Sequence, residues 1–156
     1  MPAESWNRDP GDERRLAASL FNRTWALLDK ADRTADEDDE MIHAAHASRH
    51  HWGVVGGPVQ WARGEWQCSR VYSVLGRPEP AMYHARRCLA LSTEYDLGPF
   101  DLGAAHEAIA RSHQVAGEPA RAAEHVVLAR GEAARITDEE DRAILDADLA
   151  DLSQRG

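Results

Sequence analysis

Histidines are the residues of this chain whose type and spacing most readily suggest chemistry, and the sequence contains eight of them. His43, His46 and His50 follow one another at i, i+3 and i+7, which places them on one face of a helix. His46 and His50 form an i, i+4 pair that can share one divalent transition metal ion. The pattern therefore offers a two-histidine metal site, although a solvated polar helix face is the interpretation that we favour.

The sequence also contains one motif of the kind that di-iron proteins need twice. Glu40 and His43 have the Glu-x-x-His spacing of di-iron helical bundles, but such a site needs a second motif of this kind. The sequence has no second motif and no His-Glu-x-x-His pattern, so we exclude both a di-iron site and a zinc-protease site. Four other residues stay open as ligands or catalytic groups of a small enzyme: Glu65, His84, His106 and His113.

The stretch from Trp61 to Leu91 has the pattern of a helical hairpin. Apolar and small residues recur at helical spacing up to Leu75, and Gly76-Arg77-Pro78 then ends one helix and opens the next. Small residues such as Ala81 and Ala85 in the second helix favour close antiparallel packing. We therefore predict a pair of antiparallel helices here, and an all-α fold for the chain, because no segment has the pattern of a strand.

This hairpin resembles the tetratricopeptide repeat. The aromatic, turn and small residues of that pattern correspond here to Tyr72, Gly76, Ala81 and Cys88. A shift of the sequence by 41 residues brings similar residues together: Trp25 with Trp66, Gly76 with Gly117, and His43 with His84 and His125. The resemblance implies a degenerate repeat of three tetratricopeptide-like hairpins in a right-handed superhelix, followed by a C-terminal capping helix.

The breaks between the periodic segments give the expected domain organisation. We expect a flexible N-terminal arm over 1–12 and a single helical domain over 13–156, with hairpins at about 13–52, 58–96 and 101–135. Asp101 is the expected N-cap of the fifth helix. A capping helix is expected over 138–154, because its leucines form one apolar side and its many acidic residues suit a solvent-exposed face.

The resemblance also directs attention to one face of the array. In tetratricopeptide arrays the first helices of successive hairpins line a concave groove, and their expected groove residues here are Trp25, Asp29, Arg63, Trp66, Arg70, Glu107 and Arg111. Guanidinium groups can bind a carboxylate or phosphate through two parallel hydrogen bonds, and indole rings offer flat apolar faces. We therefore predict a binding or scaffold module that holds a peptide, a protein partner or a small acidic ligand. In the alternative interpretation these arginines pair with neighbouring acids such as Glu65, Asp29 and Glu107, and the tryptophans fill the core between hairpins.

An enzyme is the second interpretation of the same chain. Its site would lie at the junction of the second and third hairpins, where we expect His84 close to His106 or His113, and it would use a divalent transition metal. The resemblance implies these contacts, because in such arrays the position held by His43, His84 and His125 meets the first helix of the next hairpin. His43 is therefore expected close to Glu65 or Tyr72. The binding module needs no cofactor, and we favour it because no specific catalytic motif can be assembled from the sequence.

Charge and composition restrict the partners. The chain has 27 acidic and 18 basic residues and a formal net charge of −9, which argues against nucleic acid or an anionic membrane as partner. No apolar run reaches membrane length and the first residues lack the pattern of a signal peptide, so we expect a cytoplasmic protein. Cys68 and Cys88 occupy predicted core positions and should be reduced thiols. Homo-oligomerisation stays open.

Overall fold

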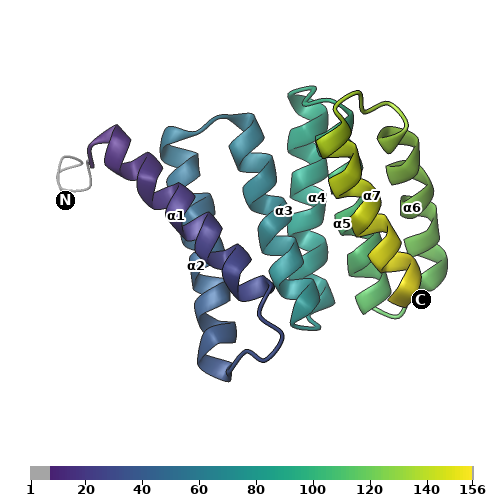
Figure 1. Ribbon diagram of the computed structural model, residues 1–156, viewed down its shortest axis with the longest axis horizontal. Helices are drawn as coiled ribbons and strands as arrows, with labels where there is room; N and C mark the ends of the chain where they lie inside the picture. The colour runs from purple at the N-terminus through teal and green to yellow at the C-terminus, as the bar shows by residue number, and fades with distance from the viewer. Residues whose placement is uncertain (1–7, 156) are drawn as a thin grey trace.

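The computed structural model describes residues 8–155, which form seven α-helices and no strands (Figure 1). The helices are α1 (Pro10–Leu28), α2 (Ala35–Val55), α3 (Pro58–Val74), α4 (Pro78–Glu94), α5 (Pro99–Val115), α6 (Pro119–Ala133) and α7 (Glu139–Arg155). The first six pair as three successive hairpins, α1 with α2, α3 with α4 and α5 with α6. The predicted all-α hairpin array is therefore confirmed.

Prolines set the starting points of most of these helices. Pro10, Pro58, Pro78, Pro99 and Pro119 each lie in the first turn of a helix. The missing N–H of proline costs nothing there, and its fixed φ is already helical. Proline thus marks five of the seven helix starts, although from the sequence the start of α1 was expected at 13 and the N-cap of α5 at Asp101.

Local hydrogen bonds and glycines define the other ends. In α2 the N-cap Thr34 and Glu37 form a capping box, in which each backbone N–H donates to the side chain of the other residue. Gly76 and Gly117 adopt φ angles of 71° and 76°, so both hairpin turns use the left-handed region that favours glycine. The predicted N-cap of α5 is wrong, because Gly98 occupies that position and Asp101 lies inside the helix.

The helices form an open array of two layers. One layer is made by α1, α3, α5 and α7, since each of these helices contacts the next, and the other is made by α2, α4 and α6. Among the described residues α1 contacts only α2 and α3, so the array does not close into a bundle. Figure 1 shows α1 at one end of the molecule and α6 with α7 at the other. The predicted capping helix thus continues the layer of first helices.

Small residues let the helices cross closely. Ala62, Ala81 and Ala105 are completely buried. A Cβ atom on Gly103 would lie 2.5 Å from Cδ2 of Leu145, so the contact between α5 and α7 depends on glycine at that position. The sequence-based expectation of small residues at the crossings holds for these helices.

Both cysteines are free and buried, as the sequence predicted. Burial raises the pKa of Cys68 and of Cys88 to about 12. Because the thiolate is the reactive form, these side chains are inert at neutral pH and act as small apolar core residues.

The boundaries differ from the sequence-based ones at a few points. Helix α1 begins at Pro10, so 10–12 belong to the helical array and not to the expected arm, of which 1–7 lie outside the described residues. Helix α2 continues to Val55, past the predicted end at 52, because Gly53 does not interrupt it. Within 8–155 no helix is both long enough and apolar enough to cross a membrane.

Candidate binding groove between α1 and α7

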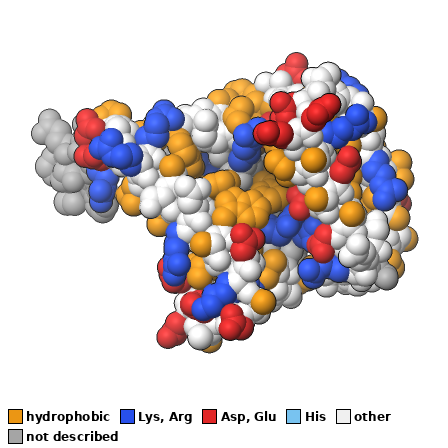
Figure 2. All heavy atoms as spheres, viewed as in Figure 1, with side chains coloured by type: hydrophobic (Ala, Val, Ile, Leu, Met, Phe, Trp, Pro, Cys, Tyr) orange, Lys and Arg blue, Asp and Glu red, His pale blue; other side chains and the backbone are white. Residues whose placement is uncertain are grey.

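A groove runs along the layer of first helices, with α1 and α7 as its walls and α3 and α5 as its floor. Two neighbouring pockets make it up, and Trp25 of α1 lines both. Figure 2 shows hydrophobic side chains gathered in a hollow at the centre of this face, with basic and acidic side chains around it. The backbones of α1 and α7 stay apart in the described part of the chain, so the groove is open between its two walls.

The first pocket, which we call the apolar pocket, has a volume of about 340 Å³. Its lining comprises apolar side chains with three charged residues: Phe21, Trp25, Trp66, Phe100, Ala104, Ile144, Leu145, Cys88, Arg63, Asp101 and Asp148. This volume lies at the lower end of the range of ligand pockets, about 300–1,000 Å³. The apolar pocket therefore suits one large side chain or one small ligand.

Aromatic contacts hold the walls of the apolar pocket in place. The rings of Trp25 and Trp66 lie 5.4 Å apart between centroids, and Phe21 meets Trp25 edge to face at 6.3 Å. Arg63 lies over the ring of Phe100, 5.3 Å from its centroid. Trp66 is also covered from one side by Arg70, at 4.8 Å. The aromatic surface is thus fixed by contacts between α1, α3 and α5.

The second pocket, which we call the charged pocket, has a volume of about 310 Å³. Its lining is Trp25, Leu28, Asp29, Arg70, Ser73, Val74, Arg111, Gln114, Val115, Asp151 and Arg155. Trp25 lines both pockets, so a ligand that fills both contacts its indole ring. The groove therefore changes from apolar to charged along its length.

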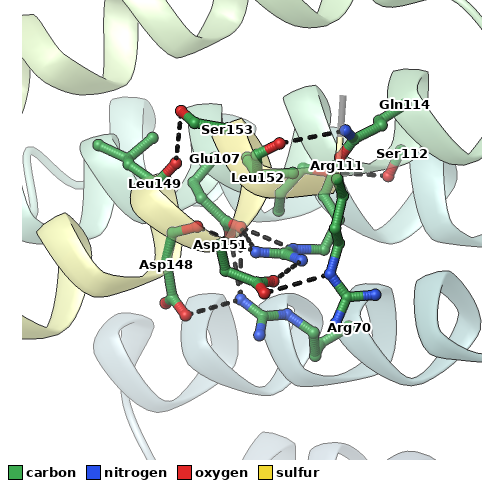
Figure 3. A network of polar contacts seen from close by, with 12 residues as sticks. Arg70, Glu107, Arg111, Ser112, Gln114, Asp148, Leu149, Asp151, Leu152 and Ser153 are labelled. Carbon is green, nitrogen blue, oxygen red and sulfur yellow. Dashed lines mark hydrogen bonds and ion pairs between the residues drawn. The ribbon is translucent and has the colours of Figure 1, made fainter.

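An ion-pair network lies under the charged pocket (Figure 3). Its centre is Glu107, whose side chain is 1% exposed. Nε of Arg111 donates to Glu107 at 2.7 Å, and Nη2 of Arg70 donates to the same carboxylate at 3.3 Å. From α7, Asp151 accepts from Arg111 at 2.8 Å and Asp148 pairs with Arg70 at 3.2 Å. Two arginines thus contact three carboxylates from two helices.

The network shifts the pKa values of its members in different directions. Burial raises the pKa of Asp148, and Glu107 adds to this rise, although Arg70 and Arg111 oppose it. Burial also acts to raise the pKa of Asp151, but hydrogen bonds from Arg111 and Arg155 outweigh it and the pKa falls. For Arg111 burial acts to lower the pKa, but the charge of Glu107 and the hydrogen bonds that the guanidinium donates to Asp151 and Glu107 raise it overall.

Six of the seven groove residues expected from the sequence line these pockets, namely Trp25, Asp29, Arg63, Trp66, Arg70 and Arg111. The seventh, Glu107, lies beneath them as the partner of two arginines. Arg63 is paired as well, with Asp101 at 3.0 Å. The arginines thus form the internal pairs that the sequence left open as the alternative, while the tryptophan rings stay partly exposed in the groove.

The contribution of α7 was missed by sequence reasoning. Ile144, Leu145, Asp148 and Asp151 belong to the wall that the sequence assigned to a capping helix. A signal for them exists, because extending the 41-residue period by one step brings Glu107 onto Asp148. The same series begins with Trp25 and Trp66, so α7 occupies the place of a first helix in a fourth hairpin.

The histidine contacts expected between hairpins are wrong. His84 lies within its own hairpin, where Nδ1 is 2.6 Å from Oε2 of Glu65 and the ring stacks on Tyr72 at 5.8 Å. His106 is instead 3.2 Å from His125, measured between the Nδ1 atoms. The ring of His113 also lies next to His125, at 5.8 Å. His84 and His125 therefore use the same geometry one period apart, each facing the first helix of its own hairpin.

His43 also fails its expected contact, because its side chain is exposed. His46, one turn later on α2, takes that place, with Nε2 2.8 Å from the hydroxyl of Tyr72. The neighbouring carboxylate of Glu65 is buried and also accepts from Arg49 and Arg87, each at 3.1 Å. Burial acts to raise the pKa of Glu65, but His84 and the two arginines outweigh it and lower the pKa.

The two sets of histidines considered for a metal are split up by the fold. His46 faces Tyr72 and His84, while His50 is exposed beside His51 at 5.3 Å between ring centroids. Within 8–155 no group of three or more histidine, cysteine or acidic side chains has a geometry that could hold a metal ion. His84 and His106 contact different partners and do not share one site.

No family model, curated protein or solved structure matched this chain. The chemistry of the groove is therefore the guide to what this protein binds.

Proposed function

We propose that this protein is a binding module that takes up a peptide segment of a partner protein in the groove between α1 and α7. The observation that carries this proposal is the apolar pocket, in which four aromatic rings line a cavity of about 340 Å³ on the open face of the array. Exposed aromatic and arginine side chains are enriched where proteins bind one another. Rings that are fixed before binding also reduce the entropy lost when a ligand enters.

The resemblance to tetratricopeptide arrays also favours this face of the molecule as the binding site. In such arrays the layer of first helices holds the ligand, and the pocket residues here come from α1, α3, α5 and α7. The volume of the apolar pocket and its continuation into the charged pocket favour a short segment, with one large apolar side chain as its anchor.

The arginines give no support to the acidic ligand considered from the sequence. Arg70 and Arg111 already bind carboxylates of the protein, and the Arg111 side chain is only 8% exposed. A ligand anion would have to replace one of these carboxylates and leave it buried without its partner, which is costly. An apolar anchor requires no such exchange.

The experiment is a selection from random peptides displayed on phage, with Ala104→Trp as the blocking variant. Ala104 is partly exposed in the apolar pocket, so an indole at this position fills the cavity. The matched control is Ala150→Trp, which adds the same side chain to an exposed position on α7 that lines neither pocket. Circular dichroism and thermal melting check that both variants fold.

We expect wild type and Ala150→Trp to enrich peptides with an aromatic or large aliphatic residue, and Ala104→Trp to lose them. Enrichment of no sequence, or of sequences that Ala104→Trp binds as well as wild type does, would overturn the proposal.

A further inference from the structure

The distribution of charge around the groove points to the kind of segment that binds there. Resting on the proposed function, we propose that the ligand is a cationic segment, with lysine or arginine residues next to its apolar anchor. The anchor enters the apolar pocket, and the cationic side chains lie along the α7 wall and over the charged pocket. This assigns a chemical class to the partner and reverses the acidic ligand expected from the sequence.

The first observation is where the net charge of the chain lies. The segment 29–40 holds seven acidic and two basic residues, a net charge of −5. Helix α7 holds six acidic residues and two arginines, a net charge of −4. Together they account for the whole formal charge of −9, because acidic and basic residues balance in the rest of the chain. Helix α7 is one wall of the groove, and Asp29, the first residue of the other segment, lines the charged pocket.

The second observation is the balance inside the groove. Arg63 is matched by Asp101, and Arg70 with Arg111 face three carboxylates. The remaining positive charge of the charged pocket is Arg155, which pairs with Asp151 but has a side chain that is 68% exposed. Positive charge in the groove is therefore already neutralised, and the surrounding acidic segments set the sign of the field that a ligand meets.

The third observation is that carboxylate oxygens remain within reach of a ligand. The side chains of Asp148 and Asp151 are 26% and 41% exposed, and each lines one of the two pockets. A ligand cation at Asp151 replaces only Arg155, which can turn into solvent. Asp148 lies in the lining of the apolar pocket itself, so a cation adjacent to the anchor reaches it without leaving the groove.

The experiment compares three short fluorescein-labelled peptides that share a central phenylalanine and differ in its flanking residues, which are lysine, serine or glutamate. Fluorescence anisotropy measures their binding to wild type at low and at high ionic strength. Two variants report on position, because Asp151→Asn and Asp146→Asn each remove one negative charge from α7. Asp146 is exposed and lines neither pocket, so it controls for the general field.

We expect the lysine peptide to bind about tenfold more tightly than the serine peptide at low ionic strength, and the glutamate peptide to bind most weakly. Added salt should remove most of this difference. Asp151→Asn should weaken the lysine peptide more than Asp146→Asn does, and it should weaken the lysine peptide by a larger factor than the serine peptide. Ala104→Trp should abolish binding of all peptides.

The outcomes separate this inference from the proposed function. If the serine and lysine peptides bind equally, or the glutamate peptide binds best, and Ala104→Trp still blocks binding, the cationic ligand is refuted and the apolar groove stands. If Asp146→Asn and Asp151→Asn have equal effects, the assignment of the cation to the charged pocket is refuted. If none of the three peptides binds and the phage selection also yields nothing, the proposed function fails.

Discussion

The buried carboxylate of Glu107 offers the sharpest test of how the groove is held together. It lies on α5 with a side chain that is 1% exposed, and it accepts hydrogen bonds from Arg111 at 2.7 Å and from Arg70 at 3.3 Å. Glu107→Gln keeps the size of the side chain and removes its charge. The two guanidinium groups would then share only the more exposed carboxylates of Asp148 and Asp151.

The expected loss of stability follows from these contacts. Two unit charges about 4 Å apart interact by about 4 kcal/mol at an effective dielectric constant of about 20. Part of this gain is cancelled by the cost of burying the ions, and breaking a buried pair by removing one partner typically costs about 3–5 kcal/mol. Because Asp148 and Asp151 remain as partners, we expect Glu107→Gln to lower the free energy of unfolding by about 2–3 kcal/mol.

Urea denaturation followed by circular dichroism at neutral pH measures this change, with thermal melting as a second readout. For a chain of this length a loss of about 2–3 kcal/mol corresponds to a fall in Tm of about 4–12 °C. The control is Glu124→Gln on α6, an exposed residue for which we expect a change within about 0.5 kcal/mol. A loss for Glu107→Gln no greater than that of the control would refute the claim that this network joins α3, α5 and α7.

Three further predictions concern other parts of the array. Burial lowers the pKa of His106 and of His125, and the two neighbouring histidines lower that of His125 further, so stability should fall as the pH drops below the ordinary value of 6.5. The melting temperature of His125→Gln should depend less on pH than that of wild type. The same pH dependence in both proteins would contradict the contact between His106 and His125. Ala81→Leu should lower the free energy of unfolding by about 1–3 kcal/mol, because Ala81 is fully buried. Ala122→Leu should change this free energy little, because Ala122 is partly exposed. Equal melting temperatures for the two variants would be evidence against this difference. Cys68 and Cys88 should react with a thiol reagent only after unfolding, and rapid labelling of the native protein would show that they are accessible.

The different effects expected for Ala81→Leu and Ala122→Leu illustrate a limit of the repeat. A shift of 41 residues places Ala81 on Ala122, and from this equivalence alone an added side chain at Ala122 should overpack a helix crossing. In the structure Ala122 is partly exposed and lines a surface pocket on α6. Both α4 and α6 contact the helix before and the helix after them, but α4 packs far more extensively on α5 than α6 does on α7.

The groove shows the same division between sequence and structure. The 41-residue period placed Trp25 and Trp66 on neighbouring helices, and the two rings are indeed in contact across α1 and α3. The period also placed Arg70 and Arg111 in the groove. It did not show that Asp148 and Asp151 neutralise these arginines, because their helix was interpreted as a solvent-facing cap.

The sequence by itself determined the helices and the order in which they pair. Proline at a helix start, glycine in a left-handed turn and small residues at helical spacing act within a few residues, so their meaning does not depend on the rest of the chain. Only the tertiary structure decided which charged and aromatic groups meet. Arg111 and Asp151 lie 40 residues apart, and His84 faces its own hairpin and not the next. Such contacts depend on how each helix is rotated about its axis, and packing of the whole array sets that rotation.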